Sequence, residues 1–174
     1  MSTRAEVTTL PPTVVMGVSA AGKSSVGRAI AARSGAAFAD GDDLHPAANV
    51  AKMARGEPLD DADRAPWLDE VGATLARHGD DGIVVACSAL KRAYRDRIRR
   101  AAPATRFVFL SGTPELLAER AGARTGHFMP PALLASQLAA LEPLAPDEAG
   151  VTLDIADPVD ALAADAVAAL RESR

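Results

Sequence analysis

The amino-acid sequence predicts an α/β fold of three layers, in which a five-stranded parallel sheet is flanked by helices. Short apolar runs alternate with helical patterns along the chain, and this alternation is typical of βαβ units. A glycine-rich sequence, G-x-x-x-x-G-K-S at 17–24, joins the first apolar run to the first helical pattern. The length of 174 residues suits one domain with a sizeable core. The expected strands are 13–16, 37–40, 83–87, 106–110 and 151–155.

The helices between these strands have recognisable ends. Serine and threonine cap helix N-termini, proline suits the first turn, and glycine follows many helix ends. These signals predict helices over 25–33, from residue 47 to Gly56, from Pro66 to Gly79, from Ser88 to about Arg100, from Thr113-Pro114 and from Pro158. Segment 41–67 is longer than a simple crossover needs, so we expect a small helical cap at about 44–66.

Composition and charge exclude several classes of protein. The net charge of −4 gives no general attraction to nucleic acid or to an anionic membrane surface. Cys87 is the only cysteine, so no internal disulfide forms and a reducing cytoplasm is the expected compartment. No stretch approaches 18 uninterrupted apolar residues. Residues 1–12 are expected to form a short flexible leader before a single domain at 13–174.

Residues 17–24, called the phosphate loop below, predict a site for the phosphates of a nucleotide. Glycines let the backbone curl, so that successive N–H groups point inward at phosphate oxygens, and the following helix adds its positive end. Lys23 can reach the β- and γ-phosphates, and the Ser24 hydroxyl suits Mg²⁺. The competing interpretation is a glycine-rich turn with an incidental lysine. The expected nucleotide contacts are Gly17, Ser19, Ala20, Ala21, Gly22, Lys23, Ser24 and Ser25.

Two aspartates follow the second expected strand, at the sheet edge where ligands of parallel sheets bind. Asp40 can orient a metal-bound water, and Asp42 can accept a proton from an attacking hydroxyl. The three acids within 40–43 repel one another unless a cation such as Mg²⁺ or Lys23 lies among them. The competing interpretation is an acidic turn whose carboxylates bond to nearby backbone amides.

Basic residues later in the chain are candidates for binding anionic groups. Arg64 lies among acids, so it can pair with them or point toward an anionic substrate. Lys91 opens a basic cluster at 91–100, whose other members are expected on a solvated helix face. Arg120 and Arg124 predict a lid at about 120–131 that closes over the phosphates and stabilises the transferring group. An ordinary exposed helix end is the alternative for this segment.

Missing motifs narrow the class of nucleotide-binding protein. Asn49 is the only asparagine, so the Asn-Lys-x-Asp guanine signature of GTPases is absent. The strands expected at 83–87 and 106–110 lack the terminal aspartate of many ATPase motors. A small kinase of a metabolite or nucleotide is the remaining class.

Motifs spread over about residues 13–170 form a consistent set. They are MGVSAAGKS at 16–24, DGDDLHP at 40–46, KM at 52–53, GEPLDDADR at 56–64, PWL at 66–68, CSALK at 87–91, YRD at 94–96, GHFM at 126–129 and Gln137. Together they resemble the small phosphate-loop gluconokinase family. The chain departs from the family at Ala20-Ala21, where Gly-Ser is more common, and at Asp60, where Asn is often found.

The resemblance implies a nucleoside-monophosphate-kinase-like fold and ATP- and Mg²⁺-dependent phosphorylation of D-gluconate on its 6-hydroxyl. Such enzymes are usually cytoplasmic homodimers. The expected catalytic residues are Lys23, Asp42, Arg120 and Arg124, with Arg120 also contacting the nucleotide. The expected gluconate contacts are Asp42, His45, Arg64, Lys91, Arg124 and His127, and the expected metal ligands are Ser24 and Asp40.

Two other functions remain open at this point. A related small kinase would act on another acceptor, such as shikimate, adenylylsulfate or a nucleoside monophosphate. A nucleotide-dependent nucleic-acid binding module would use the basic cluster at 91–100, although the net charge of −4 argues against it.

Overall fold

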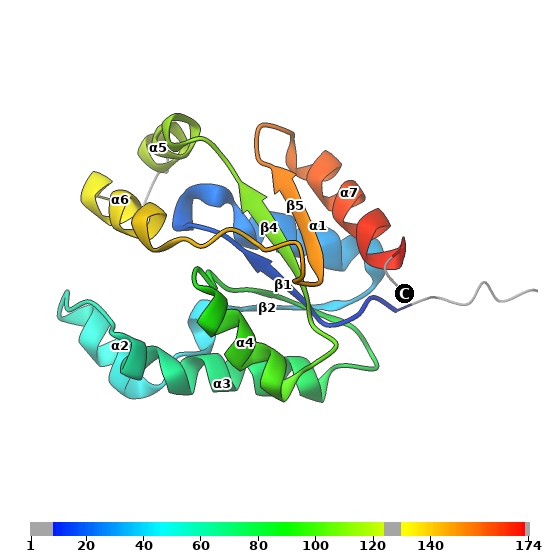
Figure 1. Cartoon of the computed structure of the whole chain (residues 1–174), viewed down its shortest axis with the longest axis horizontal. Helices are drawn as coiled ribbons and strands as arrows, with labels where there is room; N and C mark the ends of the chain where they lie inside the picture. Colours follow the sequence, from blue (N-terminus) through cyan, green and yellow to red (C-terminus); the bar gives the residue numbers. More distant parts are fainter. Residues whose placement is uncertain (1–8, 124–129, 173–174) are drawn as a thin grey trace, which may run out of the picture.

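Five parallel strands form one sheet in the order β2-β3-β1-β4-β5 (Figure 1). The computed structural model describes residues 9–123 and 130–172. The strands are β1 (Thr13–Met16), β2 (Ala37–Asp40), β3 (Ile83–Ala86), β4 (Arg106–Ser111) and β5 (Gly150–Asp154). The predicted α/β class and its five strands are confirmed, with ends that differ from the prediction by at most one residue.

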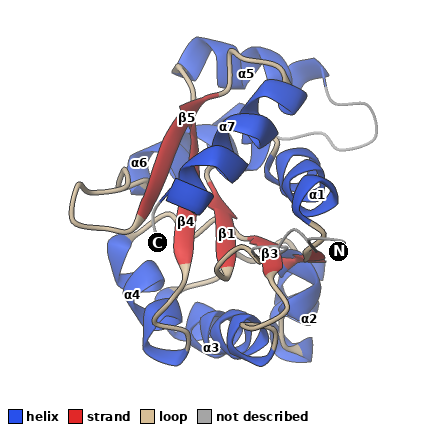
Figure 2. Ribbon diagram, turned by 90° about the vertical axis from the view of Figure 1, so that its right-hand side faces the viewer, coloured by secondary structure: helices blue, strands red, loops and turns tan. Residues whose placement is uncertain are grey.

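Helices cover both faces of the sheet and make the three layers visible in Figures 1 and 2. They are α1 (Lys23–Ser34), α2 (Ala47–Ala54), α3 (Asp61–Arg77), α4 (Arg92–Ala101), α5 (Pro114–Ala123), α6 (Pro131–Ala140) and α7 (Val159–Glu172), with short 3₁₀ turns η1 (Ser19–Ala21) and η2 (Gly41–Leu44). Successive strand residues face opposite layers. Val15 and Val108 pack with α1 and α7, whereas Val14 and Phe107 pack with α3 and α4.

Two helix starts differ from the prediction by more than two residues. Helix α3 begins at Asp61 rather than Pro66, because Asp60 and Asp63 form a capping box, each carboxylate accepting from the other's backbone N–H at 2.7 and 3.0 Å. The predicted cap at Ser88 is wrong, since α4 begins at Arg92. The backbone at Ser88 instead lies beside the phosphate loop, where its carbonyl accepts from the N–H of Gly17 at 3.2 Å.

The flexible leader was predicted to end at residue 12, but the packed domain already includes residues 9–12. Leu10 is only 2% exposed and packs in the core beneath α1 and α7. The carbonyl of Pro12 accepts from the N–H of Arg106 at 2.9 Å, which ties this segment to β4. Residues 9–12 therefore belong to the domain, and residues 1–8 lie outside the described residues. None of the helices described has the length and apolar character needed to cross a membrane.

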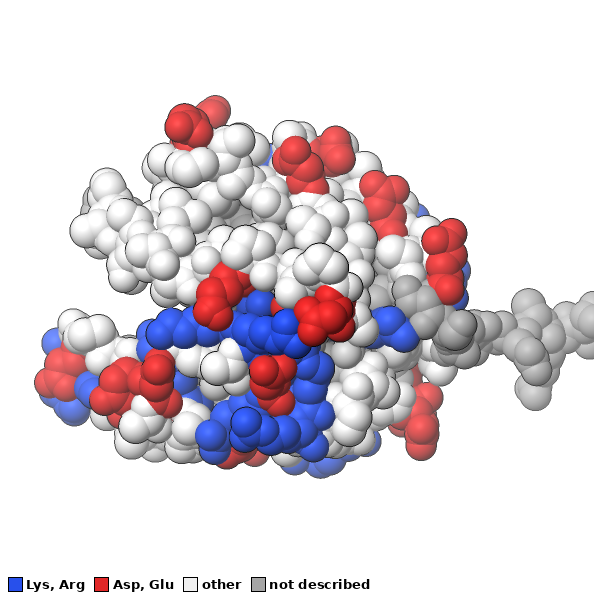
Figure 3. Space-filling model, in the orientation of Figure 1, with Lys and Arg blue, Asp and Glu red and all other residues white. Residues whose placement is uncertain are grey.

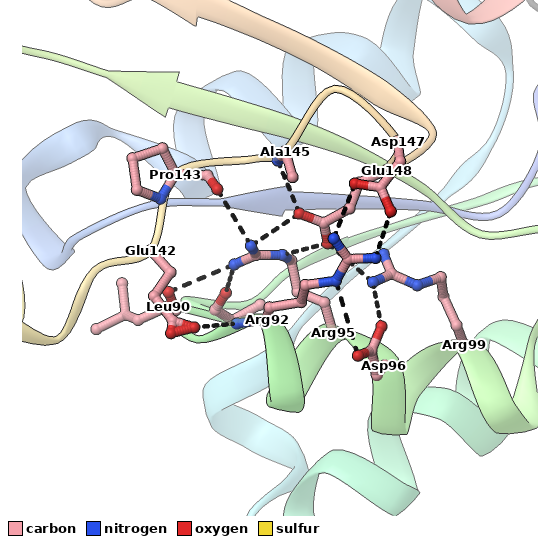
Figure 4. A network of polar contacts seen from close by, with 11 residues as sticks. Leu90, Arg92, Arg95, Asp96, Arg99, Glu142, Pro143, Ala145, Asp147 and Glu148 are labelled. Atoms are coloured by element: carbon pink, nitrogen blue, oxygen red, sulfur yellow. Dashed lines mark hydrogen bonds and ion pairs between the residues drawn. The ribbon is translucent and has the colours of Figure 1, made fainter.

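A buried ion pair ties α4 to the segment before β5 (Figure 4). The side chains of Arg95 and Glu148 are both 0% exposed, and the guanidinium donates to the two carboxylate oxygens at 2.8 and 2.9 Å. Arg99 donates a further bond to Glu148 at 2.8 Å, and Arg95 donates to the carbonyls of Ala89 and Leu90. The expectation that Arg95 lies on a solvated face is wrong, because this arginine joins three segments inside the protein.

Candidate active site

A cavity of about 570 Å³ lies at the carboxyl ends of the central strands. It opens between α2 and α6, where the space-filling view is hollowed (Figure 3). Seven of the residues predicted from the sequence line it: Ser19, Lys23, Ser24, Asp40, Asp42, His45 and Arg64. The fold thus brings the phosphate loop, the acids after β2 and an arginine of α3 to one site.

The phosphate loop curls as its glycines predict. Gly22 has a φ of 89°, a left-handed conformation that places it between η1 and the start of α1. A Cβ on Gly17 would lie 3.0 Å from the carbonyl oxygen of Leu110, so glycine is needed there for close approach. The ammonium group of Lys23 donates to the carbonyl of Val18 at 3.0 Å, which folds its side chain back over the loop.

The side chains of Ala20 and Ala21, where the chain departs from the family, point into the core. The two side chains are 6% and 1% exposed and join the core beneath α1 and α7. Neither residue is among those that line the cavity, and their contact with nucleotide stays a prediction. Ser25 is exposed on the first turn of α1, and its contact with nucleotide stays a prediction.

Ser24 and Asp40 form a pair of oxygen donors beside the phosphate loop. The Ser24 hydroxyl donates to Oδ2 of Asp40 at 3.0 Å, while Oδ1 accepts from the N–H of Asp42 at 3.0 Å. Mg²⁺ is commonly held by one or two protein oxygens together with substrate phosphates. These residues fit that pattern. No three His, Cys, Asp or Glu side chains converge as a metal cage among the residues described.

The acceptor side of the cavity is built on Trp67. Its indole N–H donates to the carbonyl of Gly41 at 2.7 Å, and the ring of His45 stacks on it with centroids 4.3 Å apart. A Cβ on Gly41 would lie 2.5 Å from the carbonyl oxygen of Ala86, so only glycine lets η2 lie this close to β3. Turn η2 is therefore anchored to the sheet, and it places Asp42 and the following His45 on the cavity wall.

Arg64 and Lys91 converge on one carboxylate. Their cationic groups lie 3.7 and 3.8 Å from Oδ1 of Asp61, which also accepts a hydrogen bond from the Tyr94 hydroxyl. That bond is the main reason that the pKa of Asp61 is lowered. Arg64 lines the cavity, whereas Lys91 is not among its lining residues. The structure brings Arg64 into the site and leaves Lys91 beside it.

Arg120 is not among the residues that line this cavity. It sits near the end of α5, where its guanidinium donates to the carbonyl of Ile155 just after β5. Arg124 and His127 lie outside the described residues, as does half of the expected lid at about 120–131. The lid and the roles of these three residues stay predictions.

The basic cluster at 91–100 is largely neutralised by acids. Five of its six cationic residues have carboxylate partners: Lys91 with Asp61, Arg92 with Asp147, Arg95 with Glu148, Arg97 with Asp69, and Arg99 with Asp96 and Glu148. Figure 3 shows the resulting mixture of positive and negative groups on this face. Because few of these charges are available to several phosphates, the surface does not favour nucleic-acid binding.

The sequence analysis did not assign Gln137 and Ser88 to the site, although both line the cavity. The Gln137 amide accepts from the N–H of Ser19 and donates to its hydroxyl, both at 2.8 Å, so α6 is joined to the phosphate loop. The position of Ser88 just after an apolar run was the available signal. Cys87 is fully buried, and burial raises the pKa of its thiol to about 12, so it is not a nucleophile.

A family model and a curated relative both match most of this chain. A family model described as an AAA domain matches residues 13–144, which include the phosphate loop and strands β1 to β4. The thermosensitive gluconokinase of Escherichia coli K12 is 46% identical over 146 residues, covering 82% of this chain and 78% of that protein.

Solved structures extend the comparison. The crystal structure of a gluconokinase from Sinorhizobium meliloti has 50% identity and a TM-score of 0.84, covering 92% of this chain and 91% of that one. The APS kinase of Mycobacterium tuberculosis shares the fold alone, with 20% identity, a TM-score of 0.67, and coverage of 94% and 99%. The chain carries the matched domain and belongs to the gluconokinase family.

Proposed function

We propose that this protein transfers the γ-phosphoryl group of ATP to the 6-hydroxyl of D-gluconate, giving 6-phospho-D-gluconate and ADP. The observation that carries the proposal is that one cavity joins the phosphate loop to the acid and arginine of the acceptor side. Direct phosphoryl transfer requires a donor half that binds the nucleotide and an acceptor half that binds the attacking hydroxyl. The gluconokinases among the relatives support gluconate as the acceptor.

The donor half uses charge and backbone amides. Lys23 and the phosphate-loop backbone hold the phosphates, aided by the N-terminus of α1. Ser24 and Asp40 would hold Mg²⁺, which neutralises phosphate charge when bound. Because the transition state of phosphoryl transfer is loose, positioning and charge stabilisation contribute more than the strength of the base.

The acceptor half orients the hydroxyl and binds the carboxylate. Asp42 is on the cavity wall close to the Ser24–Asp40 pair, where it can orient the 6-hydroxyl and take its proton. Arg64 offers a planar guanidinium that suits the gluconate carboxylate. We further propose that the enzyme acts as a cytoplasmic homodimer, as the family resemblance implies.

A panel of acceptors tests the proposal. In an assay that couples ADP release to NADH oxidation, we expect turnover with D-gluconate and MgATP to exceed that with shikimate, adenylylsulfate and nucleoside monophosphates by at least about 10², because a site built for one set of polar groups rejects analogues strongly. Identification of 6-phosphogluconate by mass spectrometry confirms the product. Faster turnover with one of the other acceptors would assign the chain to that reaction instead.

Arg64→Ala tests the carboxylate partner. We expect the KM for gluconate to rise about 10- to 100-fold, since a charge-assisted hydrogen bond is lost, while the KM for ATP changes little. Arg55→Ala is the matched control, because Arg55 forms an exposed pair with Glu57. If Arg64→Ala raised the KM for gluconate and the KM for ATP equally, this role would be contradicted. Lys91 would then be the candidate partner of the gluconate carboxylate.

A further inference from the structure

His45 is held by a ring stacked on one face and by an asparagine at Nδ1. Its ring lies almost parallel to that of Trp67, at an interplanar angle of 13°. Its Nδ1 lies 3.2 Å from Nδ2 of Asn49, which is on the first turn of α2 and only 4% exposed. The same Nδ2 is 2.9 Å from the backbone carbonyl of Asp63 in α3. Asn49 therefore joins the cap, α3 and the imidazole through one amide nitrogen.

The backbone carbonyl decides the direction of these hydrogen bonds. A carbonyl oxygen only accepts, so the NH₂ group of Asn49 must face Asp63. Its second hydrogen is then available to Nδ1 of His45, which has to accept it. An imidazole that accepts at Nδ1 is neutral and carries its single proton on Nε2. The tautomer of His45 thus follows from the position of a peptide carbonyl in α3.

Burial of the imidazole favours the same neutral state. Burial lowers the pKa of His45, Asp42 raises it and Arg64 lowers it further, with a net lowering from the ordinary value. Protonation would also place an Nδ1–H against the N–H of Asn49. His45 is therefore unsuited to act as a general base through Nδ1, and this leaves Asp42 as the base on this wall of the cavity.

We propose that Asn49 is a positioning residue that holds His45 as a neutral imidazole whose Nε2–H donates to a hydroxyl oxygen of the acceptor. The proposal rests on the proposed function for its ligand, a polyhydroxy acid. A neutral donor suits a hydroxyl oxygen, whereas the carboxylate of such an acid is matched by the cationic Arg64. Within the described residues, no hydrogen bond to Nε2 is found, and His45 lines the cavity. The pair would help the site to distinguish a polyol chain from an acceptor that lacks hydroxyls.

Nitrogen NMR of the imidazole tests the tautomer directly. In ¹⁵N-labelled protein at pH 7, long-range ¹H–¹⁵N spectra resolve the tautomers of the three histidines, and His45→Gln assigns the signal of His45. We expect the Nε2–H form in the wild type and a mixture of tautomers in Asn49→Ala. An Nδ1–H form or an imidazolium in the wild type would overturn the proposal. This spectrum requires no turnover, so its failure is distinct from failure of the gluconate assignment.

Steady-state kinetics test the role of the Nε2–H of His45 in binding the acceptor. We expect Asn49→Ala to raise the KM for gluconate about three- to tenfold without a similar rise in the KM for ATP, since one oriented hydrogen bond is weakened. Val50→Ala is the matched control, because Val50 is the exposed neighbour on α2. His45→Phe keeps an aromatic ring on Trp67 but has no donor, whereas His45→Gln restores an N–H. Equal gluconate KM values for these two variants would overturn the donor role, even if Asn49→Ala fails to fold.

Discussion

Replacing Asp42 by asparagine is expected to lower kcat by about 10² to 10⁴, the contribution typical of a general base. Asparagine keeps the shape of the side chain but cannot take the proton of the attacking hydroxyl. The N–H of residue 42 would still donate to Asp40, so the geometry of η2 should survive the change. Steady-state kinetics with gluconate as the varied substrate measure the effect.

Asp43→Asn is the control for this substitution. Asp43 is the exposed neighbour in the same turn and is not among the residues that line the cavity. We expect its kcat to stay within about threefold of the wild type, because it removes the same charge as Asp42→Asn but at a surface position outside the cavity. A kcat for Asp42→Asn close to that of Asp43→Asn would remove Asp42 from the mechanism and leave positioning alone to explain catalysis.

The sheet was predictable because each strand is a short apolar run bounded by turn residues. β1, β3 and β4 lie at or next to the centre of the sheet and are buried on both faces, so their sequences are continuous apolar runs. The strong signal of the phosphate loop also located the end of β1, and it located the start of α1 to within two residues. Helix starts were harder to predict, since the capping box at Asp60 competes with the signal of Pro66 and begins the helix earlier.

The roles of single cations could not be read from the sequence. Local pattern allowed both a salt bridge and a substrate contact for Arg64, and the structure combines them, with Asp61 beside it and the cavity in front. Lys91 has the same partner and lies over the Tyr94 ring, 5.6 Å from its centroid, but it is not among the residues that line the cavity. The difference depends on how α3 packs against α4, which no local spacing reveals.

The burial of Arg95 could not be read from the sequence either. It belongs to a run of six cations in ten residues, and the helical period places it on one face with Lys91 and Arg99. The sequence does not say whether that face meets solvent or protein. Its partner Glu148 is 53 residues further along, so their pairing is a property of the fold.

Glu148→Gln is expected to lower the free energy of unfolding by about 3 to 5 kcal/mol, because it leaves the buried guanidinium of Arg95 without a counter-charge. Chemical denaturation at pH 7 measures this loss. Asp147→Asn is the matched control, since Asp147 pairs with Arg92 at the surface and such pairs contribute about 0 to 1 kcal/mol. Equal losses of unfolding free energy in the two variants would contradict a special stabilising role for the buried Glu148.

The pH dependence of the Glu148→Gln effect separates charge from packing. Burial opposes ionisation of Glu148, but hydrogen bonds from Arg95, the N–H of Ala145 and Arg99 outweigh it and lower its pKa to about 2. A carboxylate with a lowered folded-state pKa stabilises the fold above its unfolded pKa, and this contribution is lost as pH falls through the folded value. The difference between wild type and variant should therefore be constant from pH 7 to about 5 and shrink between about pH 4.5 and 2. A difference that does not change with pH would mean that the glutamate acts by packing. In that case the charge of Glu148 would not explain why Arg95 stays buried. The buried Arg95 donates to the carbonyls of Ala89 and Leu90 beside the active-site cavity.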